Sequence, residues 1–419
     1  MRTVLLALPL ILAGACARTV LPASPTVTPV TRVPHLAAVD GLIPAPPEAV
    51  GLDADLPARL DSIVREGLAE GAAPGAALAV GRWGRLVILK GYGTLDYVAG
   101  SPPADASTLY DMASLTKVVA TTTCAMILEE EGKLDINRTV QSYLPEFDAP
   151  DKAAITVRML LTHRGGLEAF APLWREFHGR AEYIAAINSR PLKSVPGTEM
   201  VYSDWDFILM QAIIERITGR TLDSFAAQHV FVPLGMTSTR FTPDTNDAAL
   251  MRRIAPTELD SLRGQIHGTV HDPNAWALGG VSGHAGLFSD ARDVALFAQT
   301  LLNGGSFAGV RIVKPETLAR WTSPQDPGSS RALGWDTPSD VSSGGHYFSP
   351  RSFGHTGFTG TSMWMDPERG LFVVLLMNRV NPHGIATRHS QLRRDVADAV
   401  QSAISDAPLV DWEAMREKK

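Results

Sequence analysis

The sequence predicts an α+β fold, with an antiparallel sheet flanked by helices and an inserted helical lobe. Two pairs of strand-like segments support this prediction. Residues 76–81 and 86–91 are apolar and are joined by a turn that contains glycine, and residues 361–366 and 371–378 repeat the arrangement near the other end of the chain. Helical patterns fill most of the sequence between the two hairpins. We therefore expect the first and last strands to meet in one sheet that the helices cover.

The helices are indicated by apolar residues that recur every three or four positions. Residues 56–70 place Leu60, Val64 and Leu68 on one face, and Gly71 ends the segment. Similar patterns occupy residues 115–131, 156–163, 205–218 and 291–303. A cleft between the helical lobe and the sheet is the expected place for a small-molecule site.

Composition and charge exclude several classes of protein. The chain has 419 residues, of which 45% are hydrophobic and 20% are charged, as in ordinary globular proteins. Lys and Arg number 38 against 44 Asp and Glu, and no Lys/Arg-rich run occurs, so we expect no nucleic-acid partner. Only two cysteines are present, which excludes a disulfide scaffold and a cysteine-based zinc site.

The two ends of the chain differ from its body. Arg2 precedes a short apolar run that ends in small residues, a pattern typical of a signal peptide. Cys16, at the end of this run, offers a lipid anchor as the alternative to simple export. The predicted organisation is a signal peptide or lipoprotein signal at 1–17, a proline-rich linker at 18–51, one folded domain at 52–408 and a tail at 409–419. We expect an exported protein, either periplasmic or membrane-anchored outside the cytoplasm.

A serine and a lysine at the start of one predicted helix form the candidate nucleophile. Ser114 and Lys117 are three residues apart, so a helix places them on the same face. A serine hydroxyl needs a neighbouring group to accept its proton, and a helix N-terminus adds free N–H groups for developing negative charge. The alternative is a helix-terminal serine and a surface lysine. Val118, Val119 and Cys124 argue against it, because they make this helix apolar nearly all round.

Two further motifs follow along the chain. In order, the three motifs are Ser114-Leu115-Thr116-Lys117, Tyr202-Ser203-Asp204 and His355-Thr356-Gly357. Their order and spacing resemble those of the serine β-lactamase and penicillin-binding-protein superfamily, above all its class C-like branch with D-alanyl-peptidase and esterase relatives. The resemblance extends over about residues 56–380 and implies a β-lactamase/transpeptidase-like fold.

The resemblance implies a role for each of these residues. Ser114 would attack an acyl carbonyl and form an acyl-enzyme, and Lys117 and Tyr202 would share the proton that Ser114 gives up. The backbone N–H groups of Ser114 and Phe358 would form the oxyanion hole. His355 would offer a donor or a partial positive charge to a substrate carboxylate. The full set implied in substrate binding, besides the oxyanion hole, is His355, Thr356, Gly357 and Asp204.

Two positions depart from the usual motifs of the superfamily. Asp204 stands where asparagine is usual, so an acceptor-only carboxylate replaces amide donors, and its charge should keep Lys117 protonated. His355 stands where lysine is usual, and a histidine carries a weaker, pH-dependent charge. Both differences reduce the efficiency of β-lactam hydrolysis that we expect.

The sequence thus predicts a serine hydrolase, with a D-alanyl-D-alanine-type carboxypeptidase as the leading interpretation. Its substrates would be cell-wall peptides or related amides and esters. The alternatives are a class C-like β-lactamase, an esterase of the same superfamily and an inactive penicillin-binding-like module that only binds. The expected partner is a small-molecule or peptide substrate, such as a cell-wall peptide, a β-lactam or an ester, and no metal or other cofactor is expected.

The histidines outside the three motifs are interpreted as structural. His267 and His271 are four residues apart, but the stretch lacks the glutamate of a zinc helix and is rich in residues that disfavour a helix. With His284 they are expected in a loop or in the wall of the cleft. The glycine-rich residues 279–286 are expected to run close to that cleft. His163 is expected to end its helix.

Overall fold

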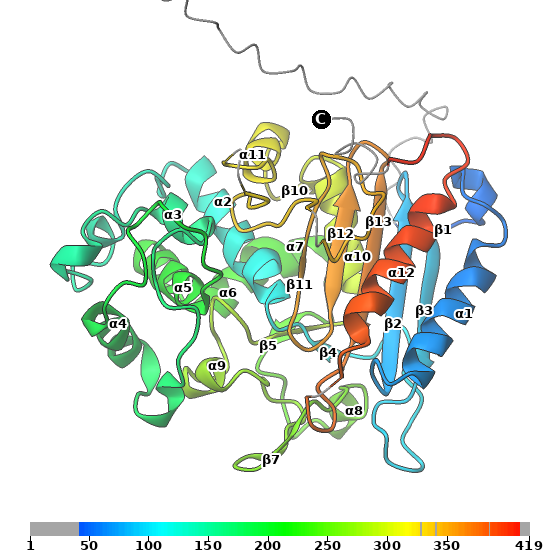
Figure 1. Ribbon diagram of the computed structural model, residues 1–419, viewed down its shortest axis with the longest axis horizontal. Coiled ribbons are helices and arrows are strands. Elements are labelled where there is room, and N and C mark those ends of the chain that lie inside the picture. Colours follow the sequence, from blue (N-terminus) through cyan, green and yellow to red (C-terminus); the bar gives the residue numbers. More distant parts are fainter. Residues whose placement is uncertain (1–41, 327–328, 340–341, 385, 411–419) are drawn as a thin grey trace, which may run out of the picture.

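The computed structural model describes residues 42–326, 329–339, 342–384 and 386–410 (Figure 1). The predicted signal peptide with Cys16, and most of the predicted tail, lie outside the described residues. A six-stranded sheet occupies one half of the molecule, in the order β1-β3-β2-β13-β12-β11. Its strands are β1 (Ile43–Pro44), β2 (Gly75–Arg82), β3 (Arg85–Gly93), β11 (Phe353–Thr356), β12 (Ser362–Asp366) and β13 (Leu371–Met377).

The first and last hairpins meet at the centre of this sheet. Strand β13 pairs antiparallel with β2, so that Leu375 lies opposite Leu78. All neighbouring strands of the sheet are antiparallel except β1 and β3, which are parallel. The predicted α+β fold with an antiparallel sheet is therefore confirmed.

Helices cover both faces of the sheet. Helices α1 (Leu56–Ala69) and α12 (His389–Ser402) pack together on one face, and α10 (Ala291–Leu302) packs on β2 and β13 from the other (Figure 1). Side chains of a strand point alternately to the two faces. In β2, Leu78 joins the core beneath α1 and α12, whereas Ala79 joins the larger core that α10 shares with the helical lobe.

Apart from η1, which lies between β1 and α1, the remaining helices lie between β3 and β11 in the chain, and most of them form the predicted helical lobe, on the left of Figure 1. The α-helices are α2 (Thr123–Glu130), α3 (Val157–Leu161), α4 (Gly179–Ser189), α5 (Asp204–Thr218), α6 (Leu222–Ala226), α7 (Val232–Leu234), α8 (Ala248–Met251), α9 (Pro273–Ala277) and α11 (Pro315–Trp321). Short 3₁₀ segments are η1 (Pro47–Val50), η3 (Val140–Ser142), η4 (Pro150–Lys152) and η5 (Leu173–Arg175), and η6 (Ala227–Phe231) is π-helical. None of the helices described is long and apolar enough to cross a membrane.

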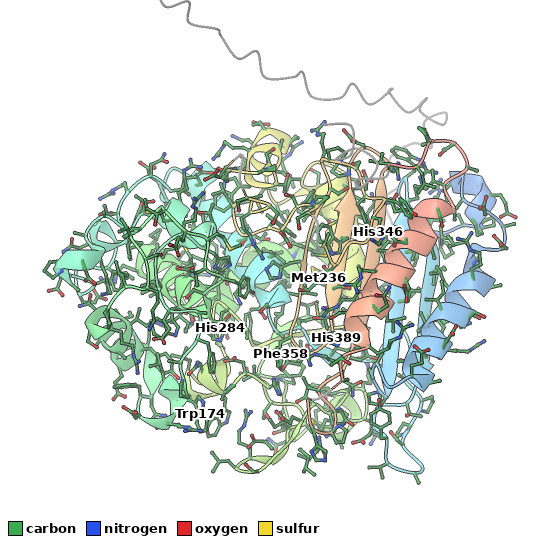
Figure 2. All side chains as sticks on the ribbon, viewed as in Figure 1. Trp174, Met236, His284, His346, Phe358 and His389 are labelled. Atoms are coloured by element: carbon green, nitrogen blue, oxygen red, sulfur yellow. The ribbon has the colours of Figure 1, made fainter. Side chains whose placement is uncertain are left out.

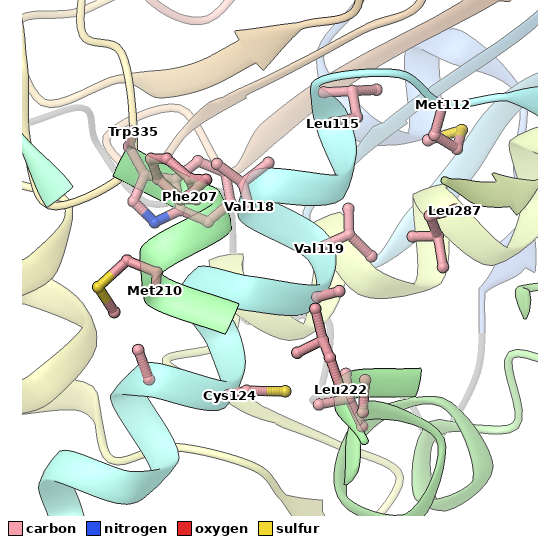
Figure 3. Packing of buried hydrophobic residues seen from close by; sticks show 14 of the residues in the cluster. Met112, Leu115, Val118, Val119, Cys124, Phe207, Met210, Leu222, Leu287 and Trp335 are labelled. Atoms are coloured by element: carbon pink, nitrogen blue, oxygen red, sulfur yellow. The ribbon is translucent and has the colours of Figure 1, made fainter. Parts of the chain in front are cut away.

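The helix that carries the candidate nucleophile is divided in two. Within the predicted segment 115–131, Lys117–Thr122 form a π-helical segment, η2, that continues directly into α2. A π-helical turn inside a helix is frequent at functional sites. Figure 3 shows Val119 and Cys124 in the packed interior with Leu222 of α6, and all three are fully buried. The interpretation of this segment as a buried helix is correct.

Short strands connect the lobe to the large sheet. Strands β4 (Tyr110–Asp111), β8 (Leu287–Ser289) and β5 (Arg240–Phe241) form a three-stranded sheet in the order β4-β8-β5. Two small hairpins are β6 (Leu259–Asp260) with β7 (Gly264–Gln265), and β9 (Ser306–Phe307) with β10 (Val310–Arg311). Strand β4 leads directly into the turn that carries Ser114, so the β4–β8 pairing fixes where that turn begins.

The folded body extends further toward the N-terminus than the sequence predicts. Ile43 and Pro44 form strand β1 on the edge of the large sheet, and Val50 at the end of η1 is fully buried. Both segments belong to the predicted linker at 18–51. A proline is tolerated on an edge strand, where its missing N–H breaks no ladder hydrogen bond. The packed part of the chain therefore includes residues from about 42, rather than starting at 52.

Replacing Leu375 with alanine should destabilise the whole domain. Leu375 is 1% exposed and lies on β13 opposite Leu78 of β2, in the core beneath α1 and α12, so its loss leaves a cavity where the two hairpins meet. We expect the free energy of unfolding in urea to fall by about 2–5 kcal/mol. Val232→Ala is the control, because this side chain is 75% exposed and its loss should change the value by less than about 0.5 kcal/mol. Equal effects of the two substitutions would contradict the described core.

Candidate active site

The turn before Ser114 holds a strained backbone. Ala113 has a φ of 44°, in the left-handed region that residues with a side chain rarely adopt. The Asp111 carboxylate accepts the Ala113 N–H through Oδ1 at 2.8 Å, and its Oδ2 accepts the N–H of His271 at 2.6 Å. Asp111 therefore stabilises the turn and connects it to the loop that carries His271.

Lys117 is a fully buried ammonium beside the nucleophile. Its Nζ donates to Ser114 Oγ at 2.9 Å, to Asp204 Oδ1 at 2.7 Å and to the His284 carbonyl at 3.2 Å. Burial alone would lower the pKa of Lys117, but the attraction of the Asp204 carboxylate outweighs it and raises the pKa to about 12. This contact agrees with the expectation that Asp204 keeps the lysine protonated. Ser114 Oγ therefore receives a hydrogen bond from an ammonium.

Tyr202 lies just before α5 and faces the same lysine. Its ring centroid is 4.9 Å from Lys117 Nζ and 5.2 Å from the guanidinium carbon of Arg331. Since Lys117 is protonated and all its hydrogens have acceptors, it cannot also take the Ser114 proton. Tyr202 is the remaining candidate for the proton acceptor among the predicted residues.

Two backbone N–H groups are available for an oxyanion. Among the described residues, neither the N–H of Ser114 nor that of Phe358 donates to another group. The loop of Phe358 is pressed against the nucleophile turn, since a Cβ on Gly357 would come within 2.4 Å of the Met112 carbonyl oxygen. Only glycine allows this approach. The hydroxyl of Thr361 donates to the same Met112 carbonyl at 3.0 Å, which fixes the spacing of the two N–H groups.

His355 is placed in the pocket wall but is neutral. Its Nδ1 lies 2.7 Å from the Thr356 carbonyl, so Nδ1 carries the hydrogen, and the buried Nε2 has no partner within the described residues. Burial, and then the charges of Arg331 and Lys117, hold the pKa of His355 well below its usual range. The partial positive charge expected from the sequence is therefore not present at neutral pH.

One pocket of about 830 Å³ brings the predicted residues together. Those that line it are Ser114, Tyr202, Asp204, His355, Thr356, Gly357 and Phe358. Lys117 lies at the base of this group, behind Ser114. The pocket opens where β11, the edge strand of the large sheet, faces the start of α5. The pocket thus lies between sheet and lobe, where the sequence predicts the site.

Several residues of the pocket escaped the sequence analysis. Asp272, which caps α9, holds His284 Nε2 at 2.8 Å, and the other nitrogen of His284 meets Ser282 Oγ at 2.8 Å. The pair Asp272-Pro273 is typical of the start of a helix, so the cap could be predicted from the sequence. That Asp272 lines the pocket could not be predicted, because it depends on the tertiary fold. Arg331 lies in a segment without periodicity, so no local pattern marks it.

The glycine-rich loop runs along the pocket as expected, but the three histidines do not converge. A Cβ on Gly283 would come within 2.1 Å of the Phe207 carbonyl oxygen, so glycine lets this loop lie against α5. His267 bonds the Ile254 carbonyl and His271 bonds Glu258. In the described part of the chain, the group with metal-ligand spacing is instead Asp204, Asp272 and His284. Lys117 and the Asp272–His284 contact already engage its donor atoms.

Comparison with known proteins points to one family. The family model described as Beta-lactamase matches residues 60–398. A protein of Salmonella agona (strain SL483) named "Putative D-alanyl-D-alanine carboxypeptidase" is 34% identical over 384 residues, which cover 82% of this chain and 86% of that protein.

Solved structures share the fold. EstCE1, described as a hydrolase with promiscuous acyltransferase activity, superimposes with a TM-score of 0.68 at 23% identity, covering 83% of this chain and 98% of that one. A penicillin-binding protein homologue from Caulobacter crescentus gives 0.66 at 22% identity, covering 83% and 99%. The superfamily and fold inferred from the three motifs are thereby confirmed. The chain is a serine hydrolase that belongs to the β-lactamase family.

Proposed function

We propose that this protein is an exported D-alanyl-D-alanine-type carboxypeptidase that works through an acyl-enzyme on Ser114. The observation that carries the proposal is the contact of Ser114 Oγ with the Lys117 ammonium, next to two free N–H groups in one pocket. The name of the Salmonella agona relative supports the choice of substrate. Export rests on the signal-peptide pattern of residues 1–17 alone.

Acylation follows from the placement of these groups. Ser114 Oγ attacks the carbonyl carbon of the terminal peptide bond, and the carbonyl oxygen becomes an oxyanion between the N–H groups of Ser114 and Phe358. Tyr202 takes the Oγ proton and returns it to the leaving amine nitrogen, which departs as the free D-amino acid. Lys117 stays protonated and stabilises the negative charge that develops near Oγ. Water then attacks the acyl-Ser114 ester by the same route and releases the shortened peptide.

The substrate carboxylate needs a cation, and His355 does not provide one. Arg331 lines the pocket beside Tyr202, and the Asp336 carboxylate is 4.0 Å from its Nε, beyond hydrogen-bond distance. That Nε has no hydrogen-bond partner among the described residues. A partly buried guanidinium whose Nε has no hydrogen-bond acceptor among the described residues is suited to a carboxylate, because such charge-assisted bonds are strong and directional. Arg331 is accordingly the proposed carboxylate-binding residue.

Ser114→Ala should abolish acylation. We expect the wild type to be labelled durably by a fluorescent penicillin, and to release D-alanine from a peptide ending in D-Ala-D-Ala, whereas the variant does neither. Ser189→Ala, at an exposed position, is the matched control and should behave as the wild type. Rapid turnover of the penicillin would identify a β-lactamase instead. Absence of both labelling and peptide cleavage in the wild type would refute the proposal.

Asp204→Asn should increase turnover of a chromogenic cephalosporin. Loss of the carboxylate removes the attraction that raises the pKa of Lys117, so burial then lowers this pKa and more of the lysine is neutral and able to accept a proton. Each unit by which the pKa falls increases the neutral fraction about tenfold at a given pH below it. The measurement is kcat/KM against pH, whose rise on the alkaline side should move to lower pH. Asp204→Glu keeps the charge and serves as control, and unchanged or lower turnover in Asp204→Asn contradicts this account.

Arg331→Gln should weaken binding of substrates with a free carboxylate only. A lost charge-assisted hydrogen bond corresponds to about 1.5–3 kcal/mol, so KM for the D-Ala-D-Ala peptide should rise about ten- to a hundredfold. The same peptide with its C-terminus amidated should show little change. Arg216→Gln, on the exposed end of α5, is the control. Equal losses on the acid and the amide would show that Arg331 acts in another way.

A further inference from the structure

His163 contacts three consecutive residues, Val201 to Ser203, just before α5. Its carbonyl oxygen accepts the N–H of Val201 at 2.9 Å, and its Nδ1 accepts the N–H of Ser203 at 3.2 Å. Between these two residues, the ring of Tyr202 packs on the His163 ring with a centroid distance of 4.4 Å. His163 itself is 1% exposed and has a φ of 56°, so a strained backbone places this imidazole behind Tyr202.

The contacts of His163 Nδ1 indicate that the neighbouring Asp206 is protonated. Asp206 Oδ2 lies 2.9 Å from the same Nδ1 that accepts the Ser203 N–H. If Nδ1 carried a hydrogen, that hydrogen and the one from Ser203 would point at each other. The Ser203 hydrogen bond thus favours an unprotonated Nδ1, and a close contact between two acceptor atoms then requires that the Asp206 carboxyl group bring the hydrogen. The ring hydrogen then lies on Nε2, which is buried and has no partner among the described residues.

The surroundings of Asp206 Oδ1 favour a protonated, neutral Asp206. Oδ1 is buried and has no hydrogen-bond partner within the described residues, and a Cβ on Gly165 would come within 2.9 Å of it. A buried carboxylate without donors would be strongly destabilised, whereas the carbonyl oxygen of a carboxylic acid is less so.

We propose that His163 and a protonated Asp206 form a neutral hydrogen-bonded pair that positions Tyr202 for proton transfer. The proposal rests on the proposed function in so far as Tyr202 accepts the Ser114 proton. His163 and Asp206 are positioning residues here, since the contacts of His163 that bear on the reaction are those with residues 201–203.

The charged surroundings support the neutral forms. Lys117 and Asp204 face the pair from η2 and α5, and Arg331 and His355 face it from the opposite wall. Burial, followed by the positive charges of Arg331 and Lys117, holds the pKa of His163 well below its usual range. Burial, followed by the charge of Asp204, holds the pKa of Asp206 well above its usual range.

A neutral Asp206 also preserves the ion pair that serves Ser114. Asp204 and Asp206 both lie in the first turn of α5, and Asp204 is the counter-charge of Lys117. An ionised Asp206 would add a second negative charge close to this pair without a donor of its own. With the proton on Asp206, the Lys117–Asp204 pair keeps one positive and one negative charge.

The tautomer of His163 can be tested without any substrate. In protein labelled with ¹⁵N-histidine, we expect the His163 signals of a neutral ring with hydrogen on Nε2, identified by their absence in His163→Gln. An imidazolium, or a hydrogen on Nδ1, between pH 6 and 8 would overturn the proposal. Because this measurement involves no reaction, it decides on the pair even if the protein cleaves no D-Ala-D-Ala peptide.

The positioning role is tested by the rate of Ser114 acylation by a fluorescent penicillin. Asp206→Ala removes the donor and should slow the acylation step about 10–100-fold, with the apparent affinity changed less than about threefold. Asp206→Asn keeps a neutral donor and should restore most of the rate, with the pH profile of the wild type. Because asparagine can also accept a hydrogen from Nδ1 through its amide oxygen, an ionised Asp206 is recognised by the hydrogen on Nδ1 in the ¹⁵N measurement rather than by this variant.

Two controls separate positioning from general damage. Asp223→Ala lies in the first turn of α6, away from the pocket, and should leave the acylation rate unchanged. Thermal unfolding of each variant reports whether it folds. If Asp206→Asn and Asp206→Ala lose the same rate, or if neither loses any, the pair does not position Tyr202.

Discussion

The buried ammonium of Lys117 organises the site, because a charge removed from water is stable only where acceptors replace the water at each hydrogen. Ser114 Oγ, Asp204 Oδ1 and the His284 carbonyl supply these acceptors. They come from the nucleophile's own turn, from the start of α5 and from the glycine-rich loop. One cation thus fixes the relative positions of three segments that are far apart in the sequence. Moving any of them would leave an unsatisfied hydrogen on a buried charge, so the geometry around Ser114 is determined by hydrogen-bond satisfaction as well as by packing.

The other side of the site depends on the large sheet. Phe358 follows β11, whose register with β12 places His355 opposite Met363. The turn after β11 is held to the nucleophile turn by Thr359, which donates to the Asp111 carbonyl, and by Thr361. Strand β11 in turn depends on β12 and β13, and β13 pairs with β2 from the N-terminal hairpin. The distance between the N–H groups of Ser114 and Phe358 therefore depends on the pairing of the first and last hairpins, β2 with β13.

The sequence predicted those features that are encoded locally. The hairpins and the long helices follow from apolar periodicity, and the serine and lysine follow from their spacing on a helix. The tyrosine and the third-motif residues follow from the resemblance to the superfamily. The π-helical form of η2 could not be predicted, because α- and π-helical segments of this length share the same apolar pattern. The neutrality of His355 depends on a carbonyl contact and on burial, which are both tertiary. In the sequence, Asp206 has the pattern of an ordinary acidic residue in the first turn of a helix. The protonated form proposed for it depends on the hydrogen bond from the Ser203 N–H to His163 Nδ1, which is a tertiary contact.

The distribution of charge in the pocket separates two tasks. Proton handling at Ser114 takes place around Lys117, whose charge Asp204 balances. His163, Asp206 and His355 add no charge to this region in their neutral forms. Arg331 then lies on the wall beside Tyr202, 4.0 Å from the Asp336 carboxylate, and its Nε has no hydrogen-bond partner within the part of the chain that the structure describes. In the proposed function, an anionic group of a substrate binds at that wall, whereas the counter-charge of Lys117 is Asp204, on another element. Carboxylate recognition can therefore be altered through Arg331 while the state of Lys117 remains under the control of Asp204.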